Sequence, residues 1–172
     1  MSILATDPIA FSGLVEALQF VLPYAAELTP KMTTELERQV YLEMEEDGLG
    51  LPGWLLSTGT LRIVSLLALL RHPSPPPLIV VEEIENGLDP RTISLLAEEL
   101  RVAVNSRRTQ VILTTHSPYL LDLLPLRSLV AVERVDNHPV FFRPSDRTEL
   151  EKWAADFAPG QLYVMDQLRR RR

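Results

Sequence analysis

Apolar positions along the chain recur at two different spacings, which predicts a mixture of helices and strands. Between residues 11 and 21 they recur every three or four positions after Asp7-Pro8, which is typical of a capped amphipathic helix. From residue 39 to 45 apolar and polar residues alternate, which predicts a strand with one exposed face. Asp47-Gly48 predicts a turn, and the Gly- and Pro-rich residues that follow predict an irregular segment as far as Trp54.

Downstream, uninterrupted apolar strands alternate with helices. Residues 60–71 and 90–105 read as helices, and residues 78–81 and 109–115 read as strands that are apolar on both faces. A short helix is expected at 117–124. This order predicts an α/β fold with a parallel sheet covered by helices.

Two further strands and a last helix complete the predicted order. Residues 128–135 predict a third strand, and residues 138–144 a fourth beyond an Asp136-Asn137 turn. Ser145 is expected to cap the last helix, and Pro159-Gly160 to end it.

Composition places few limits on function. With 172 residues, 46% hydrophobic and 23% charged, the chain is typical of one globular domain or a part of a larger one. It has no cysteine and no apolar run of membrane-spanning length, so a cytoplasmic location is the default expectation. The formal charge is −6, and the basic run Arg169–Arg172 is expected to be a solvated tail, with contact to a polyanion as the alternative.

Acidic and polar residues directly follow both inner strands. Glu82 and Glu83 come after the first, and His116-Ser117 comes after the second. Burying a lone carboxylate is costly, and in parallel sheets ligands bind at the carboxyl ends of the strands. This pattern therefore predicts a ligand or metal site at the rim of the sheet.

Three segments in this order, LLSTGTLR, LIVVEEIENGLDP and VILTTHSPYLLD, resemble the second half of an ABC-type ATPase head. The closest likeness is to RecF-like and SMC-like ATPases of the AAA group, including the overcoming-lysogenization-defect family. The resemblance implies a P-loop NTPase fold, and it is strongest between Leu55 and Asp122. Residues 1–172 would then be the C-terminal part of one ATPase domain. Within it, a lead-in (1–54) precedes the motif-bearing core (55–135) and a C-terminal strand with helices (136–172).

The resemblance assigns a role to each motif residue. Ser57, Gly59 and Thr60 match the signature motif, which meets the nucleotide of a second head. Glu82 and Glu83 match Walker B, in which the first acid holds Mg²⁺ through water and the second polarises the attacking water. Two structural alternatives remain, namely a simple helix cap at Ser57 and two acids that only face water. Arg62 is either a charge sensor of the signature motif or an ordinary arginine of the helix surface.

Two further motifs lie downstream. Asp89 matches the D-loop, which contacts the partner head across the dimer seam, and Asp89-Pro90 is also a plain helix start. His116 matches the H-loop histidine, which hydrogen-bonds the γ-phosphate; a neutral imidazole can donate such a bond.

A glycine-rich phosphate loop of the form G-x-x-x-x-G-K-[S/T] does not occur in the sequence. The two lysines, Lys31 and Lys152, do not follow a glycine. In the family this Walker A loop lies in an N-terminal half. We therefore expect the chain to be a piece of a longer protein or the product of a split gene, with a degenerate relative as the alternative.

The resulting functional hypothesis is ATP binding and hydrolysis, with ATP and Mg²⁺ as ligands. The expected partners are the missing Walker A half, a second head in a homodimer, and DNA or a nuclease or other effector; no membrane is expected. The resemblance implies DNA repair or phage defence, and the isolated chain is expected to be inactive. The alternatives are a metal-dependent nuclease built on the Glu82/Glu83 cluster and a non-catalytic module that docks on a complete ATPase.

Overall fold

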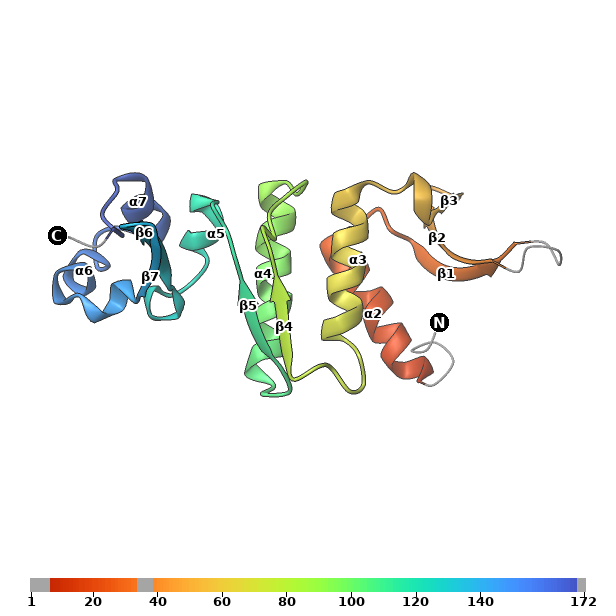
Figure 1. Ribbon diagram of the computed structural model, residues 1–172. Helices are drawn as coiled ribbons and strands as arrows, with labels where there is room; N and C mark the ends of the chain where they lie inside the picture. Colours follow the sequence, from red (N-terminus) through yellow and green to blue (C-terminus); the bar gives the residue numbers. More distant parts are fainter. Residues whose placement is uncertain (1–6, 34–38, 170–172) are drawn as a thin grey trace. The chain divides into compact units, whose positions relative to one another are not determined.

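The computed structural model describes residues 7–33 and 39–169, and these form two compact units that divide between Leu113 and Thr114 (Figure 1). Of the basic run Arg169–Arg172, only Arg169 is among the described residues, so the predictions for the rest of that run lie outside them. The unit boundary falls inside the predicted core segment 55–135, and the division into three functional segments stays a prediction.

Three helices pack against one another in the first unit (Figure 1): α2 (Pro8–Val21), α3 (Thr58–Leu70) and α4 (Pro90–Asn105). The predicted cap of the first helix is confirmed, because the Asp7 carboxylate accepts a 3.0 Å hydrogen bond from the amide of Ala10. Helix α4 buries one face, which includes Glu99, and Arg71 at the end of α3 pairs with this carboxylate at 2.5 Å. This pairing compensates the charge that Glu99 brings into the helix interface.

An antiparallel sheet of three strands precedes α3: β1 (Glu27–Met32), β2 (Val40–Glu46) and β3 (Leu49–Pro52). The strand predicted at 39–45 is confirmed as β2. The prediction of an irregular segment after Asp47-Gly48 was wrong for β3. Both turn residues have positive φ, 51° and 78°, and this two-residue hairpin turn brings the Gly- and Pro-containing segment back onto β2.

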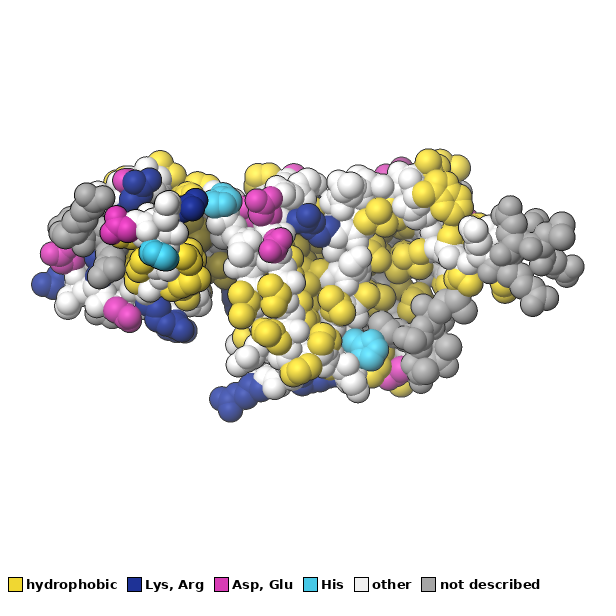
Figure 2. All heavy atoms as spheres, viewed as in Figure 1, with side chains coloured by type: hydrophobic (Ala, Val, Ile, Leu, Met, Phe, Trp, Pro, Cys, Tyr) yellow, Lys and Arg dark blue, Asp and Glu magenta, His cyan; other side chains and the backbone are white. Residues whose placement is uncertain are grey.

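The predicted parallel pair is formed by β4 (Leu78–Val81) and β5 (Gln110–Leu113), in the register Leu78↔Gln110 to Val81↔Leu113. Helix α4 connects the two strands and packs against the pair, and Ile79 is buried. The opposite face is apolar and exposed: Leu78, Val80 and Ile112 are 44%, 61% and 55% exposed. Figure 2 shows hydrophobic side chains over this part of the surface.

The second unit begins with α5 (Pro118–Asp122), followed by an antiparallel hairpin of β6 (Ala131–Val135) and β7 (His138–Phe142). The predicted third strand therefore pairs with the fourth and not with β4 or β5. The turn residues Asp136 and Asn137 have φ values of 48° and 66°, so the hairpin closes locally through a two-residue turn.

The chain ends in two short helices, α6 (Thr148–Trp153) and α7 (Pro159–Val164). Two sequence predictions fail here: Arg147, not Ser145, is the residue before α6, and Pro159-Gly160 begins a helix instead of only ending one. Pro159 occupies the first helical position, where its missing N–H costs nothing. The buried core of this unit is made of leucines, namely Leu121, Leu129, Leu150, Leu162 and Leu168.

Candidate functional site

Ser57 is the cap of α3 and lies exposed at its N-terminus. Its Oγ accepts a hydrogen bond of 3.0 Å from the amide of Thr60 and lies 2.9 Å from the Thr60 hydroxyl. Thr60 itself is buried. The structure thus places Thr60 beneath Ser57, where it orients the hydroxyl that a ligand would meet. The helix behind it has 13 residues, so its N-terminal amides and dipole favour an anion at this end.

Gly59 is buried against the turn that follows β4. A Cβ at this position would lie 2.3 Å from the carbonyl oxygen of Gly87, and Gly87 has a φ of 78°. Glycine is therefore needed here because two backbone segments touch, a packing reason that the motif alone does not reveal. The contact fixes the start of α3 against the loop between β4 and α4.

The two glutamates follow β4, and both are exposed. Glu83 has a φ of 44°, in the left-handed region that a β-carbon disfavours. The Asn86 side-chain amide donates to the Glu83 carboxylate, and the Asn86 main-chain N–H donates to the Glu83 carbonyl at 3.0 Å. A tight turn thus holds this carboxylate at the carboxyl end of the strand.

Arg62 joins the two motifs. Its guanidinium donates to the main-chain carbonyl of Glu82 at 3.1 Å and also to that of Glu83. The side chain is half-buried, so it is not an ordinary arginine of the helix surface. Because α3 carries Arg62 one turn after Ser57, any shift of this helix would pull on the backbone that carries the two glutamates. Figure 2 shows acidic and basic side chains next to each other in this part of the first unit.

Asp89 caps α4 and binds its first turn. Its carboxylate accepts from the amides of Arg91 and Thr92 at 3.0 Å and 3.1 Å, and from the Thr92 hydroxyl at 2.5 Å. The Thr92 hydroxyl and amide hold the pKa of the Asp89 carboxyl below its usual 3.8, against a smaller opposing effect of desolvation. The predicted helix start is confirmed, and the contact with a second head stays a prediction.

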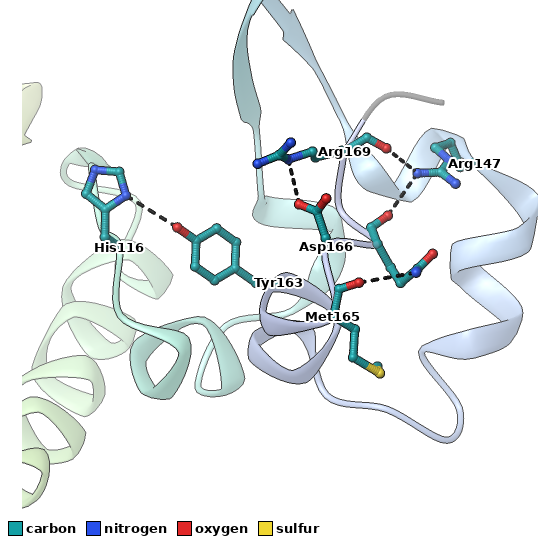
Figure 3. A network of polar contacts seen from close by, with 7 residues as sticks. His116, Arg147, Tyr163, Met165, Asp166 and Arg169 are labelled. Atoms are coloured by element: carbon teal, nitrogen blue, oxygen red, sulfur yellow. Dashed lines mark hydrogen bonds and ion pairs between the residues drawn. The ribbon is translucent and has the colours of Figure 1, made fainter. Parts of the chain in front are cut away.

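His116 belongs to the second unit and is exposed in the loop before α5. Ser117 caps this helix, since its Oγ accepts from the amide of Leu120 at 3.3 Å. Figure 3 shows the imidazole facing Tyr163 of α7, whose hydroxyl oxygen lies 3.5 Å from His116 Nδ1.

Metal binding by the described residues would depend on a ligand supplying most of the coordination. Within residues 7–33 and 39–169, no three His, Asp or Glu side chains come together as a metal site. Mg²⁺ in nucleotide sites takes one or two protein carboxylates, with phosphates and water completing its shell. Exposed Glu82 fits that requirement. A two-metal nuclease centre needs more carboxylates, whereas Asp89 is engaged as a helix cap.

The first unit thus brings together the predicted signature and Walker B segments, through contacts that the motifs did not predict. Asn86, Gly87 and Tyr163 were missed as functional candidates. Asn86-Gly87 is a recognisable turn signal, but nothing in the sequence shows that the turn lies against Gly59. Tyr163 carries no motif, and only the fold places it next to His116.

Comparison with protein families identifies the chain at this point. Residues 9–122 match the family described as "AAA domain, putative AbiEii toxin, Type IV TA system". The chain belongs to this AAA family. The match spans all the motifs from Ser57 to His116, and the family supports nucleotide-binding ATPase chemistry with ATP and, as a rule, Mg²⁺. A search of curated proteins found no match.

Solved structures confirm the fold of this AAA family member as a partial P-loop NTPase of the SMC-head type. One chain, from the work titled "Structural biochemistry of ATP-driven dimerization and DNA stimulated activation of SMC ATPases", superposes with a TM-score of 0.65 at 12% identity. The match covers 99% of this chain and 98% of that one. The Smc head domain with a coiled coil and joint derived from Pyrococcus yayanosii gives a TM-score of 0.67 at 14% identity, covering 89% of this chain and 30% of that one.

A third structure shows the same relation. The Smc head domain with an extended coiled coil, bound to the C-terminal domain of ScpA and derived from Pyrococcus furiosus, gives a TM-score of 0.65 at 14% identity. The match covers 88% of this chain and 39% of that one. This AAA family member therefore spans less than half the length of the two Pyrococcus head chains. In the described ranges, no helix is both long and apolar enough to cross a membrane.

Proposed function

We propose that the chain supplies the hydrolytic and signature residues of an ABC-type ATPase head that binds and hydrolyses ATP. The observation that carries this proposal is the backbone of Glu83. A left-handed conformation after a parallel strand, held by Asn86 and Arg62, is a strained arrangement of the kind that accumulates at functional sites. An acid that only faced water would need neither the strain nor the contacts.

Each residue at the carboxyl ends of the strands has a separate task in this proposal. Glu83 orients and polarises the attacking water, and His116 donates a hydrogen bond to the γ-phosphate. Glu82 holds Mg²⁺ through water, and the cation, when bound, neutralises charge that develops on the phosphates. Arg62 is a positioning residue, because it holds the carbonyls on either side of the hydrolytic carboxylate.

A segment that carries a glycine-rich phosphate loop is the first proposed partner. Parallel strands are normally covered on both faces, yet the described residues leave one face of β4 and β5 exposed. Leu78, Val80 and Ile112 on this face would be buried by such a segment, which would also extend the two-stranded sheet. The short match to the Pyrococcus heads supports the same proposal, because most of each head chain lies outside it.

A second copy of the head is the other proposed partner. Ser57 and the amides of α3 would close over nucleotide held by the opposite head, and Asp89 would lie at the seam. Support comes from the exposure of Ser57 at an anion-favouring helix end, with Thr60 and Gly59 packed behind it. The proposed setting is DNA repair or phage defence, supported by the family description and by the DNA-stimulated SMC ATPases of similar fold.

A mixing experiment tests the shared site in the complete head, in which this chain is combined with the phosphate-loop segment. Ser57→Arg heads should bind ATP as monomers but fail to close, and Glu83→Gln heads should close but fail to hydrolyse. A mixed dimer then holds one intact composite site, formed by Glu83 of the first variant and Ser57 of the second. The 1:1 mixture should regain up to about a quarter of wild-type turnover, because half of randomly assorted dimers are mixed.

Two outcomes would contradict the shared site. If the mixture stays as inactive as either variant alone, Ser57 and Glu83 act within the same site. If Ser57→Arg abolishes nucleotide binding by the monomer, this residue belongs to the primary pocket.

A further inference from the structure

Helix α7 carries a side chain that reaches the H-loop histidine. The Tyr163 hydroxyl lies 3.5 Å from His116 Nδ1, and both side chains belong to the second unit (Figure 3). The separation is at the long end for a hydrogen bond, as is common for functional groups before their ligand is bound. The question is whether the contact is incidental or built into the fold.

The start of α7 is fixed against α5, the helix that directly follows the H-loop. A Cβ on Gly160 would lie 1.9 Å from the carbonyl oxygen of Pro118, so the two helices touch through backbone. The Gly160 amide also donates to the Asp122 carboxylate at 2.6 Å. This carboxylate lies at the N-terminal end of α7, where negative charge is favoured.

The other end of α7 is held as well. Leu162 is fully buried in the leucine core of the second unit. Beyond the helix, the Arg147 guanidinium donates to the main-chain carbonyls of Gln167 and Arg169 at 3.0 Å and 2.7 Å (Figure 3). Because α7 is held on both sides of Tyr163, the position of the phenol follows from packing and does not depend on its contact with His116.

We propose that Tyr163 is a positioning residue for His116, and that its hydroxyl donates a hydrogen bond to Nδ1. A neutral imidazole that accepts at Nδ1 must carry its proton on Nε2, at the far side of the ring. The proton is then placed where a phosphate oxygen can accept it. The catalytic consequence rests on the proposed role of His116, whereas the hydrogen bond itself does not.

Nitrogen NMR of the histidine rings in the full chain tests the hydrogen bond without nucleotide. The sequence has three histidines, and the His116 signals are assigned by their loss in His116→Gln. In the wild type, the Nδ1 resonance of His116 should be displaced from that of exposed His138 in the direction of a hydrogen-bonded acceptor. In Tyr163→Phe, which removes only the hydroxyl of an exposed ring, it should move to the His138 value.

Three comparisons make the result specific. Tyr24→Phe changes an equally exposed tyrosine of the first unit and should leave His116 unaltered. His72, whose Nδ1 contacts the backbone of Ser74, is an internal reference that no variant should move. Gly160→Ala should reproduce the effect of Tyr163→Phe on His116, because the added methyl group would displace α7 from α5.

The catalytic half is tested by the turnover of the complete head. Loss of one hydrogen bond should lower kcat by on the order of threefold to tenfold in Tyr163→Phe, with the KM for ATP unchanged. Unchanged His116 resonances in Tyr163→Phe would overturn the proposal. Altered resonances with wild-type kcat would overturn the positioning role alone. A failure of the ATPase assignment would appear separately, as undiminished turnover in Glu83→Gln.

Discussion

At the scale of single residues, the site is defined by side chains that serve the backbone as well as the ligand. Arg62 binds two main-chain carbonyls, and Asn86 binds the Glu83 carboxylate. Ser57 and Asp89 are helix caps. These residues would therefore be retained for local structure even without nucleotide, so experiments must separate folding from function at each of them.

Asp89 allows such a separation through pH. Its pKa is lowered in the folded chain, so the folded state binds fewer protons here than the unfolded state. The stability from this carboxylate is present above pH 3.8 and is lost as pH falls through its lower folded pKa. We expect wild type to lose more stability than Asp89→Asn, which retains a capping oxygen, in urea unfolding followed by circular dichroism from pH 6 to pH 3. Parallel losses in the two proteins would contradict the assignment.

At the scale of elements, the contact between Gly59 and Gly87 joins α3 to the loop after β4. We expect Gly59→Ala to destabilise the chain by about 1 to 3 kcal/mol, because a methyl group 2.3 Å from a carbonyl oxygen forces two backbone segments apart. Gly13→Ala is the matched control. It also lies within a helix, but nothing lies within 4 Å of its added methyl group. The control should gain up to about 1 kcal/mol, the usual advantage of alanine in a helix.

Urea unfolding of the three proteins measures this difference. Equal stability of Gly59→Ala and Gly13→Ala would show that α3 and the loop after β4 are not in contact. The prediction would then fail at its structural premise.

The elements that the sequence predicts well are those whose signals are local. Apolar runs and cap residues were sufficient for α3, α4, β4 and β5, and the D-P and S-P dipeptides marked helix starts correctly. The strand β3 was missed because its partner register depends on a turn, whereas its own residues, LGLP, have poor strand propensity. The same limit explains why β6 was assigned to the wrong sheet.

The candidate site was predictable only in part, for the same reason. Motif spacing pointed to Glu82, Glu83 and His116, since each follows a strand. Arg62 acts on a segment twenty residues away, and Tyr163 acts on one 47 residues away, so neither contact has a local signal. Side chains that join distant segments appear only when the fold is known.

At the scale of the whole molecule, the chain presents one side of a nucleotide site. The described residues leave one apolar face of β4 and β5 exposed, and the sequence has no glycine-rich phosphate loop. We therefore expect the isolated chain to bind ATP weakly, because no preorganised set of amides offsets the desolvation of a triphosphate. Titration calorimetry with Mg²⁺ should detect no binding in the low-micromolar range, and tight binding by residues 1–172 alone would refute this expectation.

The most direct measurement is ATP turnover by the complete head carrying Glu83→Gln. The amide keeps the shape of the side chain but cannot polarise water, so kcat should fall by on the order of 10² to 10⁴ while ATP affinity is retained. Glu98→Gln, which changes an exposed acid of α4, should turn over ATP like wild type. Sedimentation should also show that ATP holds the Glu83→Gln heads together as dimers. If Glu83→Gln hydrolyses ATP as fast as Glu98→Gln, the strained glutamate at the end of β4 is not the hydrolytic residue, and the central claim is wrong.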